Sequence, residues 1–151
     1  NDPEQLYKWR AQFIEEIIKP IQLKPAIRLV NKHRFKGDTV MIITATNRFV
    51  TEPIAKLFGI DILLATTPEF VNGRYTGGFE GTPCFQEGKV TLLNEWLEKS
   101  GETMENSSFY SDSYNDLPLL KLVTNPFAVD ADDILRDHAT KANWPCISLR
   151  G

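Results

Sequence analysis

The chain has 151 residues, of which 42% are hydrophobic and 25% are charged, and its formal net charge is −3. This composition is ordinary for one globular domain, and it lacks the basic excess that would attract nucleic acid or an anionic membrane. The longest apolar runs, such as IDILLA, are too short to span a bilayer. The two cysteines, Cys84 and Cys146, form neither a disulfide framework nor a zinc-binding spacing. We therefore expect a cytosolic protein.

The first residues predict two helices. Apolar residues follow helical spacing from Pro3 to Ile18, with Asp2 as a plausible N-cap, until Pro20 interrupts the pattern. A second helix ends at Gly37, whose position suits a helix C-cap. The chain thus opens with a polar, helical segment that resembles an internal part of a protein sequence more than a beginning.

A different pattern begins after this helical segment. Residues 39–46, TVMIITAT, form a β-branched apolar run that is typical of a strand buried on both faces. A helix that stops at Gly59 and a short buried strand over 60–66 follow. Asn72-Gly73 then lies between two alternating segments, which is a strong signal for a β-hairpin.

The last part of the chain alternates between helices and strands. We predict helices over 89–99, 117–122 and 132–142, and strands over 107–112, 126–129 and 145–149. Strands that alternate with helices indicate a parallel sheet with helices on both faces. The predicted fold class is therefore α/β, a Rossmann-like doubly wound parallel sheet with a β-hairpin insertion.

Polar side chains gather where the predicted strands end, and this is the edge at which parallel α/β sheets bind ligands. A threonine hydroxyl, a helix-leading lysine and carboxylates together suit a phosphate bound beside a divalent cation. The residues concerned are Thr46 and Asn47 after the first strand, Lys89 at the start of its helix, and Asp112, Asn115 and Asp116 after the third.

Each of these residues also has an ordinary structural interpretation. A threonine can simply end a strand, a lysine can be a solvated helix charge, and aspartates can serve as turn residues or N-caps. His33 and His138 lie on helical stretches without a nearby partner in the sequence, and we expect both at the surface. Cys84 has no evident base to activate it, and Gly77-Gly78 belongs to the hairpin.

Three segments that follow one another in a fixed order favour a functional site. VMIITATN, FQEGKVTLLNEWL and FYSDSYNDLPLL resemble the second, third and fourth motifs of the haloacid dehalogenase superfamily, in its phosphoserine phosphatase-like branch. The resemblance implies that Thr46, with Thr44 as the alternative, binds phosphate together with Asn47, Lys89 and Asn115. It also implies that Asp112 binds Mg²⁺ and that Asp116 orients Lys89 or a metal-bound water.

The family's first motif, D-x-D-x-T, supplies the nucleophile and the general acid/base, and it is absent here. The only D-x-D is Asp130-Ala131-Asp132, which we interpret as helix-capping. We expect residues 1–36 to be the end of a helical cap and its connection, and 37–151 to be the α/β core without its first strand. That loss would leave strand edges unpaired. We therefore expect the chain to be part of a longer protein.

The resemblance implies an Mg²⁺-dependent phosphatase of a small phosphorylated metabolite, such as phosphoserine or histidinol phosphate, that works through an aspartyl-phosphate. The alternatives are transfer to an alcohol acceptor and a non-catalytic fragment that binds phosphate or a partner. A phospho-receiver domain does not fit the order of the motifs. Without the nucleophile, the 151 residues alone should not hydrolyse a phosphomonoester.

Overall fold

The computed structural model describes residues 3–13 and 24–149, which form parts of two compact units, Asn1–Cys84 and Phe85–Gly151. Each unit contains a three-stranded sheet of its own. The predicted N-cap Asp2 and the helical positions Ile14 to Pro20 lie outside the described residues. The division at residues 1–36 and 37–151 stays a prediction.

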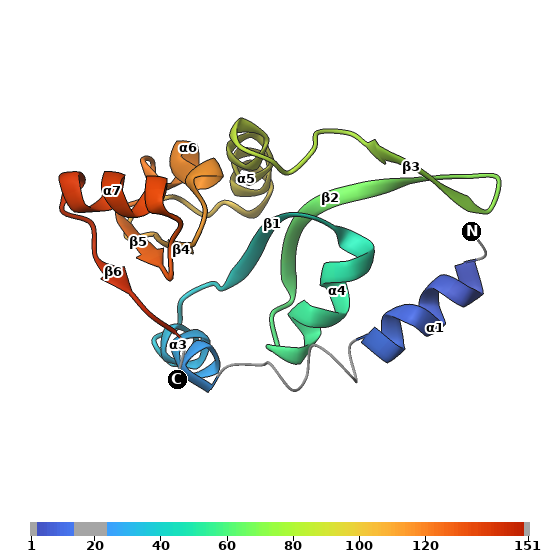
Figure 1. Cartoon of the computed structure of the whole chain (residues 1–151), viewed down its shortest axis with the longest axis horizontal. Helices are drawn as coiled ribbons and strands as arrows, with labels where there is room; N and C mark the ends of the chain where they lie inside the picture. Colours follow the sequence, from blue (N-terminus) through green and yellow to red (C-terminus); the bar gives the residue numbers. More distant parts are fainter. Residues whose placement is uncertain (1–2, 14–23, 150–151) are drawn as a thin grey trace. The chain divides into compact units, whose positions relative to one another are not determined.

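The first unit contains a parallel strand pair extended by a long hairpin (Figure 1). β1 pairs in parallel with β2, and β2 pairs antiparallel with β3. α4 packs against β1 and β2. The elements are α1 (Pro3–Phe13), α3 (Lys24–Phe35), β1 (Met41–Asn47), α4 (Arg48–Leu57), β2 (Ile62–Val71) and β3 (Arg74–Glu80).

The predicted hairpin at Asn72-Gly73 is confirmed. Both residues have positive φ angles, 51° and 77°, and Val71 is paired with Arg74 across the turn. Two successive residues with positive φ give the tight turn whose twist matches that of paired strands. This turn lets β2 continue beyond the predicted short strand and brings the hairpin alongside the end of β1.

β1 is less buried than the sequence predicts. Met41–Thr44 are only partly buried and Ala45–Asn47 are exposed, so the prediction of burial on both faces is wrong. The reason is topological, because β2 is the one described strand that is hydrogen-bonded to β1, which forms an edge of its sheet. The sequence predicts unpaired strand edges. Among the described strands, β1 and β4 each have one edge without a paired strand.

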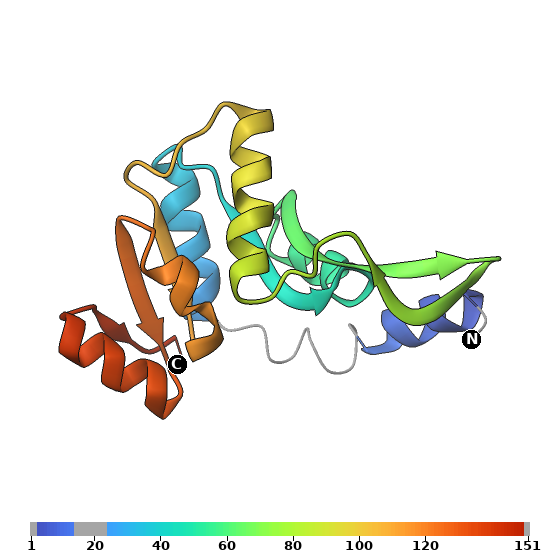
Figure 2. The same ribbon diagram turned by 90° about the horizontal axis from the view of Figure 1, so that it is seen from above.

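The second unit contains a wholly parallel sheet in the order β4-β5-β6. α7 packs against β5 and β6, and Leu120, Ala128, Ala131, Leu135 and Ala139 form its buried core. Figure 2 shows α6 and α7 beside this sheet. The elements are α5 (Glu87–Ser100), β4 (Ser108–Ser111), the 3₁₀ helix η2 (Tyr114–Asp116), α6 (Leu117–Leu120), β5 (Asn125–Val129), α7 (Asp133–Ala142) and β6 (Cys146–Ile147).

The α/β class with parallel strand pairing and a hairpin insertion is confirmed. No helix of the described ranges, 3–13 and 24–149, is long and apolar enough to cross a membrane.

Both histidines differ from the prediction of partnerless surface residues. His33 is partly buried, and its Nδ1 lies 2.8 Å from Oδ2 of Asp38. This hydrogen bond from His33 is the main reason why the pKa of the Asp38 carboxyl lies below its usual value. The His138 ring packs against Trp144 at a centroid distance of 4.8 Å. Both partners lie just beyond the end of the helix that carries the histidine, where the chain turns back toward the ring, and a one-dimensional pattern does not show this turn.

The interpretation of Asp130-Ala131-Asp132 as helix-capping is confirmed for Asp132. Its Oδ1 accepts a hydrogen bond from the Leu135 backbone N–H at 2.7 Å, at the start of α7. Its Oδ2 accepts another from the Tyr114 N–H at 2.8 Å. Asp132 therefore also holds the turn that follows β4.

Replacing Asp132 by alanine should lower the free energy of unfolding by about 1–2 kcal/mol, because a helix cap and a second hydrogen bond are lost. Asp133→Ala is the matched control. Its ion pair with Arg136 at 3.8 Å is exposed, so the expected change is within about 0.5 kcal/mol. Urea unfolding of both variants checks this, and equal losses would contradict the capping role.

Candidate active site at the carboxyl end of β4

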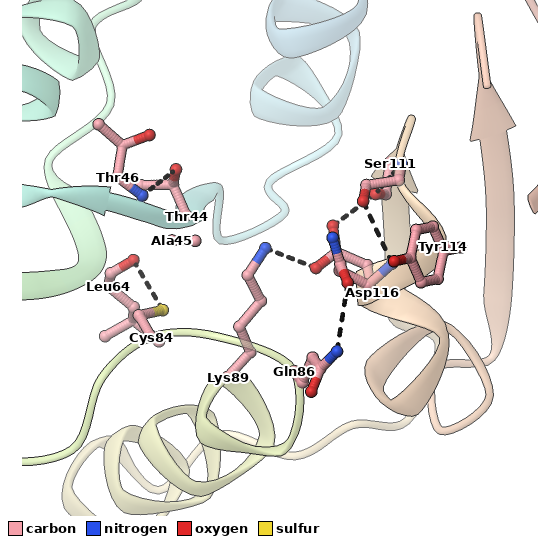
Figure 3. A network of polar contacts seen from close by, with 12 residues as sticks. Thr44, Ala45, Thr46, Leu64, Cys84, Gln86, Lys89, Ser111, Tyr114 and Asp116 are labelled. Carbon is pink, nitrogen blue, oxygen red and sulfur yellow. Dashed lines mark hydrogen bonds and ion pairs between the residues drawn. The ribbon is translucent and has the colours of Figure 1, made fainter. Parts of the chain in front are cut away.

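A buried ion pair lies at the carboxyl end of β4. Nζ of Lys89 lies 2.5 Å from Oδ1 of Asp116, and both residues are buried, with exposed fractions of 6% and 7% (Figure 3). The other carboxylate oxygen of Asp116 accepts a hydrogen bond from the Ser111 hydroxyl. Both oxygens of Asp116 therefore have a donor, and the carboxylate fixes the position of the Lys89 ammonium.

The backbone around this pair is shaped by local sequence. Gln86 precedes α5 with a positive φ of 49°, so the chain turns sharply into the helix that carries Lys89. Nε2 of Gln86 donates a hydrogen bond to Oδ1 of Asn115 at 3.2 Å. The Asn115 backbone N–H in turn donates to the hydroxyl of Ser113. The third and fourth sequence segments are thus joined by side-chain contacts within one unit.

Asp112 differs from Asp116 in its surroundings. Asp112 is exposed, and no described residue forms a hydrogen bond or ion pair with its carboxylate. The backbone carbonyl of Asp112 accepts a hydrogen bond from the Asp132 N–H at 3.0 Å. The described residues contain no group of three or more His, Cys, Asp or Glu that could hold a metal. One accessible carboxylate fits Mg²⁺, which proteins often bind through one or two carboxylates, with phosphate and water completing its shell.

The second segment lies in the other unit, at the carboxyl end of β1. Thr44 is paired with Ala65 and Asn47 with Thr66, so Ala45 and Thr46 are additional residues that bulge from the strand. The Thr46 N–H donates to the Thr44 hydroxyl at 3.2 Å.

Asn47 has a structural function at this strand end. Its side-chain oxygen accepts from the Val50 N–H at 3.0 Å and caps α4. Asn47 is exposed, as is the neighbouring Thr46. α4 begins at Arg48, two residues after Thr46, and the N–H groups of a first helical turn favour anions.

Among the predicted site residues, the structure joins Lys89 to Asp116 and Asn115 to Gln86. Sequence reasoning missed Ser111 and Gln86. Ser111 is buried, and its place directly before Asp112 at a strand end was the available signal. Cys84 is fully buried, and its thiol donates to the Leu64 carbonyl at 3.4 Å, which agrees with a packing role.

Ser111→Ala should disturb the ion pair by removing one donor from the Asp116 carboxylate. We expect the free energy of unfolding to fall by about 1–3 kcal/mol, the range for a buried polar group that loses its partner. Ser100→Ala is the control, because this exposed hydroxyl at the end of α5 contacts only local backbone among the described residues, so the expected change is within about 0.5 kcal/mol. Urea unfolding measures both changes, and an unaffected Ser111→Ala would show that this hydroxyl does not support Asp116.

The comparisons with known proteins point to one family. The family of haloacid dehalogenase-like hydrolases matches residues 2–121. A histidinol-phosphatase of Neisseria meningitidis is 42% identical to the chain, over 97% of the chain and 68% of the relative. The chain spans only about half the length of several other curated relatives that it matches.

Solved structures share the fold of this chain. The structure of a protein of unknown function from Bordetella pertussis aligns with a TM-score of 0.94 and 44% identity, over 99% of this chain and 68% of the other. A substrate-bound phosphoserine phosphatase aligns with a TM-score of 0.67 and 22% identity, over 83% of this chain and 58% of the other. The second match concerns the fold alone.

Proposed function

Since the chain belongs to the family of haloacid dehalogenase-like hydrolases, we propose that it forms most of the core of an Mg²⁺-dependent phosphatase of small phosphomonoesters. Relatives that are named phosphatases support this proposal. In the proposal, an aspartate outside these 151 residues attacks phosphorus and forms an aspartyl-phosphate. Residues of this chain bind the phosphoryl group and stabilise its charge.

The observation that carries the proposal is the buried pair of Lys89 and Asp116. A buried lysine is uncommon and costs desolvation free energy, so its retention needs a reason. Here the ammonium is fixed by a carboxylate that is itself held by Ser111. A fixed positive charge need not reorganise when negative charge develops on the phosphoryl oxygens. Such preorganised stabilisation of charge is a main source of rate gain in phosphoryl transfer.

Asp112 is the proposed Mg²⁺ ligand. Its carboxylate is accessible, and the Asp132 N–H that binds its backbone carbonyl holds it at the end of β4. A bound Mg²⁺ would supply positive charge near the phosphate oxygens. Thr46, with Thr44 as the alternative, and the first turn of α4 are the proposed phosphate donors, and Asn47 and Asn115 are proposed to lie close to the phosphate.

The proposed partner is a small phosphorylated metabolite. The similarity to a protein named histidinol-phosphatase supports histidinol phosphate as a candidate substrate, and phosphoserine is the alternative. Nothing about the described residues favours transfer over hydrolysis, so water is the simplest acceptor.

The test is product analysis with the longer protein that contains the first motif and this chain. We expect inorganic phosphate to be released from histidinol phosphate or phosphoserine with Mg²⁺, and not after its chelation. Adding amino-alcohol acceptors should leave the phosphate yield unchanged. A new phosphomonoester formed from the acceptor would show transfer, and the absence of turnover on all substrates would favour the non-catalytic alternative.

A further inference from the structure

The first unit contains a cavity that could hold the organic part of the proposed substrate. This cavity of about 520 Å³ opens at the carboxyl end of β1, between the start of α4 and the hairpin. It is lined by Ala45, Asn47, Phe49, Thr66, Pro68, Tyr75, Thr76, Gly77, Gly78 and Phe79. Ala45 and Asn47 flank Thr46, so the cavity lies directly beside the proposed phosphate-binding residue.

The chemistry of this cavity is aromatic and uncharged. Three of its lining residues, Phe49, Tyr75 and Phe79, are aromatic, and none carries a formal charge at neutral pH. Burial, followed by the nearby Tyr7, raises the pKa of the Tyr75 phenol, so this ring remains neutral. Zwitterionic groups such as the ammonium and carboxylate of an amino acid would find no opposite charge among these residues.

The aromatic wall is held in place by further contacts. Phe49 packs against Tyr7 of α1 at 5.2 Å and against Tyr75 at 5.5 Å between ring centroids. The Arg10 guanidinium lies 4.7 Å from the centroid of Phe49, and donates to its carbonyl at 3.2 Å. Phe70 packs against Tyr75 at 4.9 Å. A wall braced in this way is preorganised for stacking with a flat ring.

We propose that this cavity binds the organic group that leaves with the phosphate ester oxygen, and that this group carries a flat ring of imidazole or phenyl type. The proposal rests on the proposed phosphatase function. Ring faces would stack on Phe49, Tyr75 or Phe79, while the phosphate would lie at Thr46. An aliphatic amino acid would gain no stacking there.

The experiment measures kcat/KM of the longer protein for four phosphomonoesters. Histidinol phosphate and benzyl phosphate carry a ring, whereas phosphoserine and glycerol 2-phosphate do not, and all four are esters of aliphatic alcohols with similar leaving groups. The expected result is a preference of at least about tenfold for the ring-bearing pair, the lower end of what hydrophobic pocket contacts contribute. Equal rates, or a preference for phosphoserine, would overturn the ring assignment and leave the phosphatase function intact.

Variants then locate the preference. Tyr75→Ala and Phe79→Ala should lower kcat/KM for the ring-bearing pair by about tenfold and change the other two by less than about twofold. Tyr75→Phe keeps the ring and should retain the preference. Phe79 is 52% exposed, so its replacement should leave folding intact even if Tyr75→Ala does not fold.

The matched control is Phe35→Ala, because Phe35 is 90% exposed at the end of α3 and does not line the cavity. It should change none of the four values. Uniform losses on all substrates in Phe79→Ala would overturn the proposal. If none of the four esters is hydrolysed with Mg²⁺ present, the phosphatase function itself fails, and this inference fails with it.

Discussion

Replacing Lys89 by methionine should reduce kcat/KM of the longer protein by about a thousandfold, because one preorganised charge on the transferring phosphoryl group is lost. The same substitution should destabilise the fold. It leaves the Asp116 carboxylate buried with Ser111 as its only donor, and breaking a buried pair from one side typically costs about 3–5 kcal/mol. A solvated helix charge, the ordinary structural interpretation of Lys89, could be replaced without loss of stability, and the burial of Lys89 changes that expectation.

A double variant separates the two effects. In Lys89→Met with Asp116→Leu, both charges are removed and apolar groups of similar volume replace them, which is often neutral or stabilising. We expect the free energy of unfolding to return to within about 1 kcal/mol of the parent while turnover stays absent. A stable double variant with normal turnover would show that the pair is structural only.

Replacing Asp112 by asparagine is the second prediction with a large expected effect. The concentration of Mg²⁺ for half-maximal activity should rise by about a hundredfold or more, since even residues that merely orient a metal ligand typically contribute 10–100-fold. The stability should change by no more than about 0.5 kcal/mol, because Asp112 is exposed and its carboxylate contacts no described residue. Activity measured over a range of Mg²⁺ concentrations checks the first effect, and urea unfolding checks the second.

Asp133→Asn is the matched control for Asp112→Asn. It removes an exposed carboxylate of the same unit, and this carboxylate has no role in the proposal. It should leave the Mg²⁺ dependence unchanged. An unaltered Mg²⁺ dependence in Asp112→Asn would contradict the assignment of the metal ligand. Equal shifts in both variants would indicate a general effect of surface charge.

The order of helices and strands could be predicted because local signals are strong. Asn72-Gly73 marks the hairpin, Gly37 and Gly59 follow helix ends with positive φ, and Asp132 caps α7. The burial of β1 could not be predicted in the same way. An apolar run has the same appearance in a central strand and in an edge strand, and only the pairing partners distinguish the two.

The candidate site shows a similar division. The spacing of the motifs identified Lys89, Asp112 and Asp116, but it did not distinguish a buried carboxylate from an accessible one four residues earlier. That difference arises from the geometry of β4 and η2, which turns Asp116 toward Lys89 and Ser111. The aromatic cavity depends on residues from four elements, β1, α4, β2 and β3, and no sequence pattern connects them.

The most direct test of the proposed mechanism is to map the phosphoryl group during turnover. The longer protein is mixed with histidinol phosphate and Mg²⁺, quenched in acid, digested and analysed by mass spectrometry. We predict a phosphoryl adduct on an aspartate outside the 151 residues and none on the peptides of this chain, with the adduct lost in the stable Lys89→Met, Asp116→Leu variant. Turnover with the phosphoryl group on a residue of this chain, or with no covalent adduct at any quench time, would contradict the account.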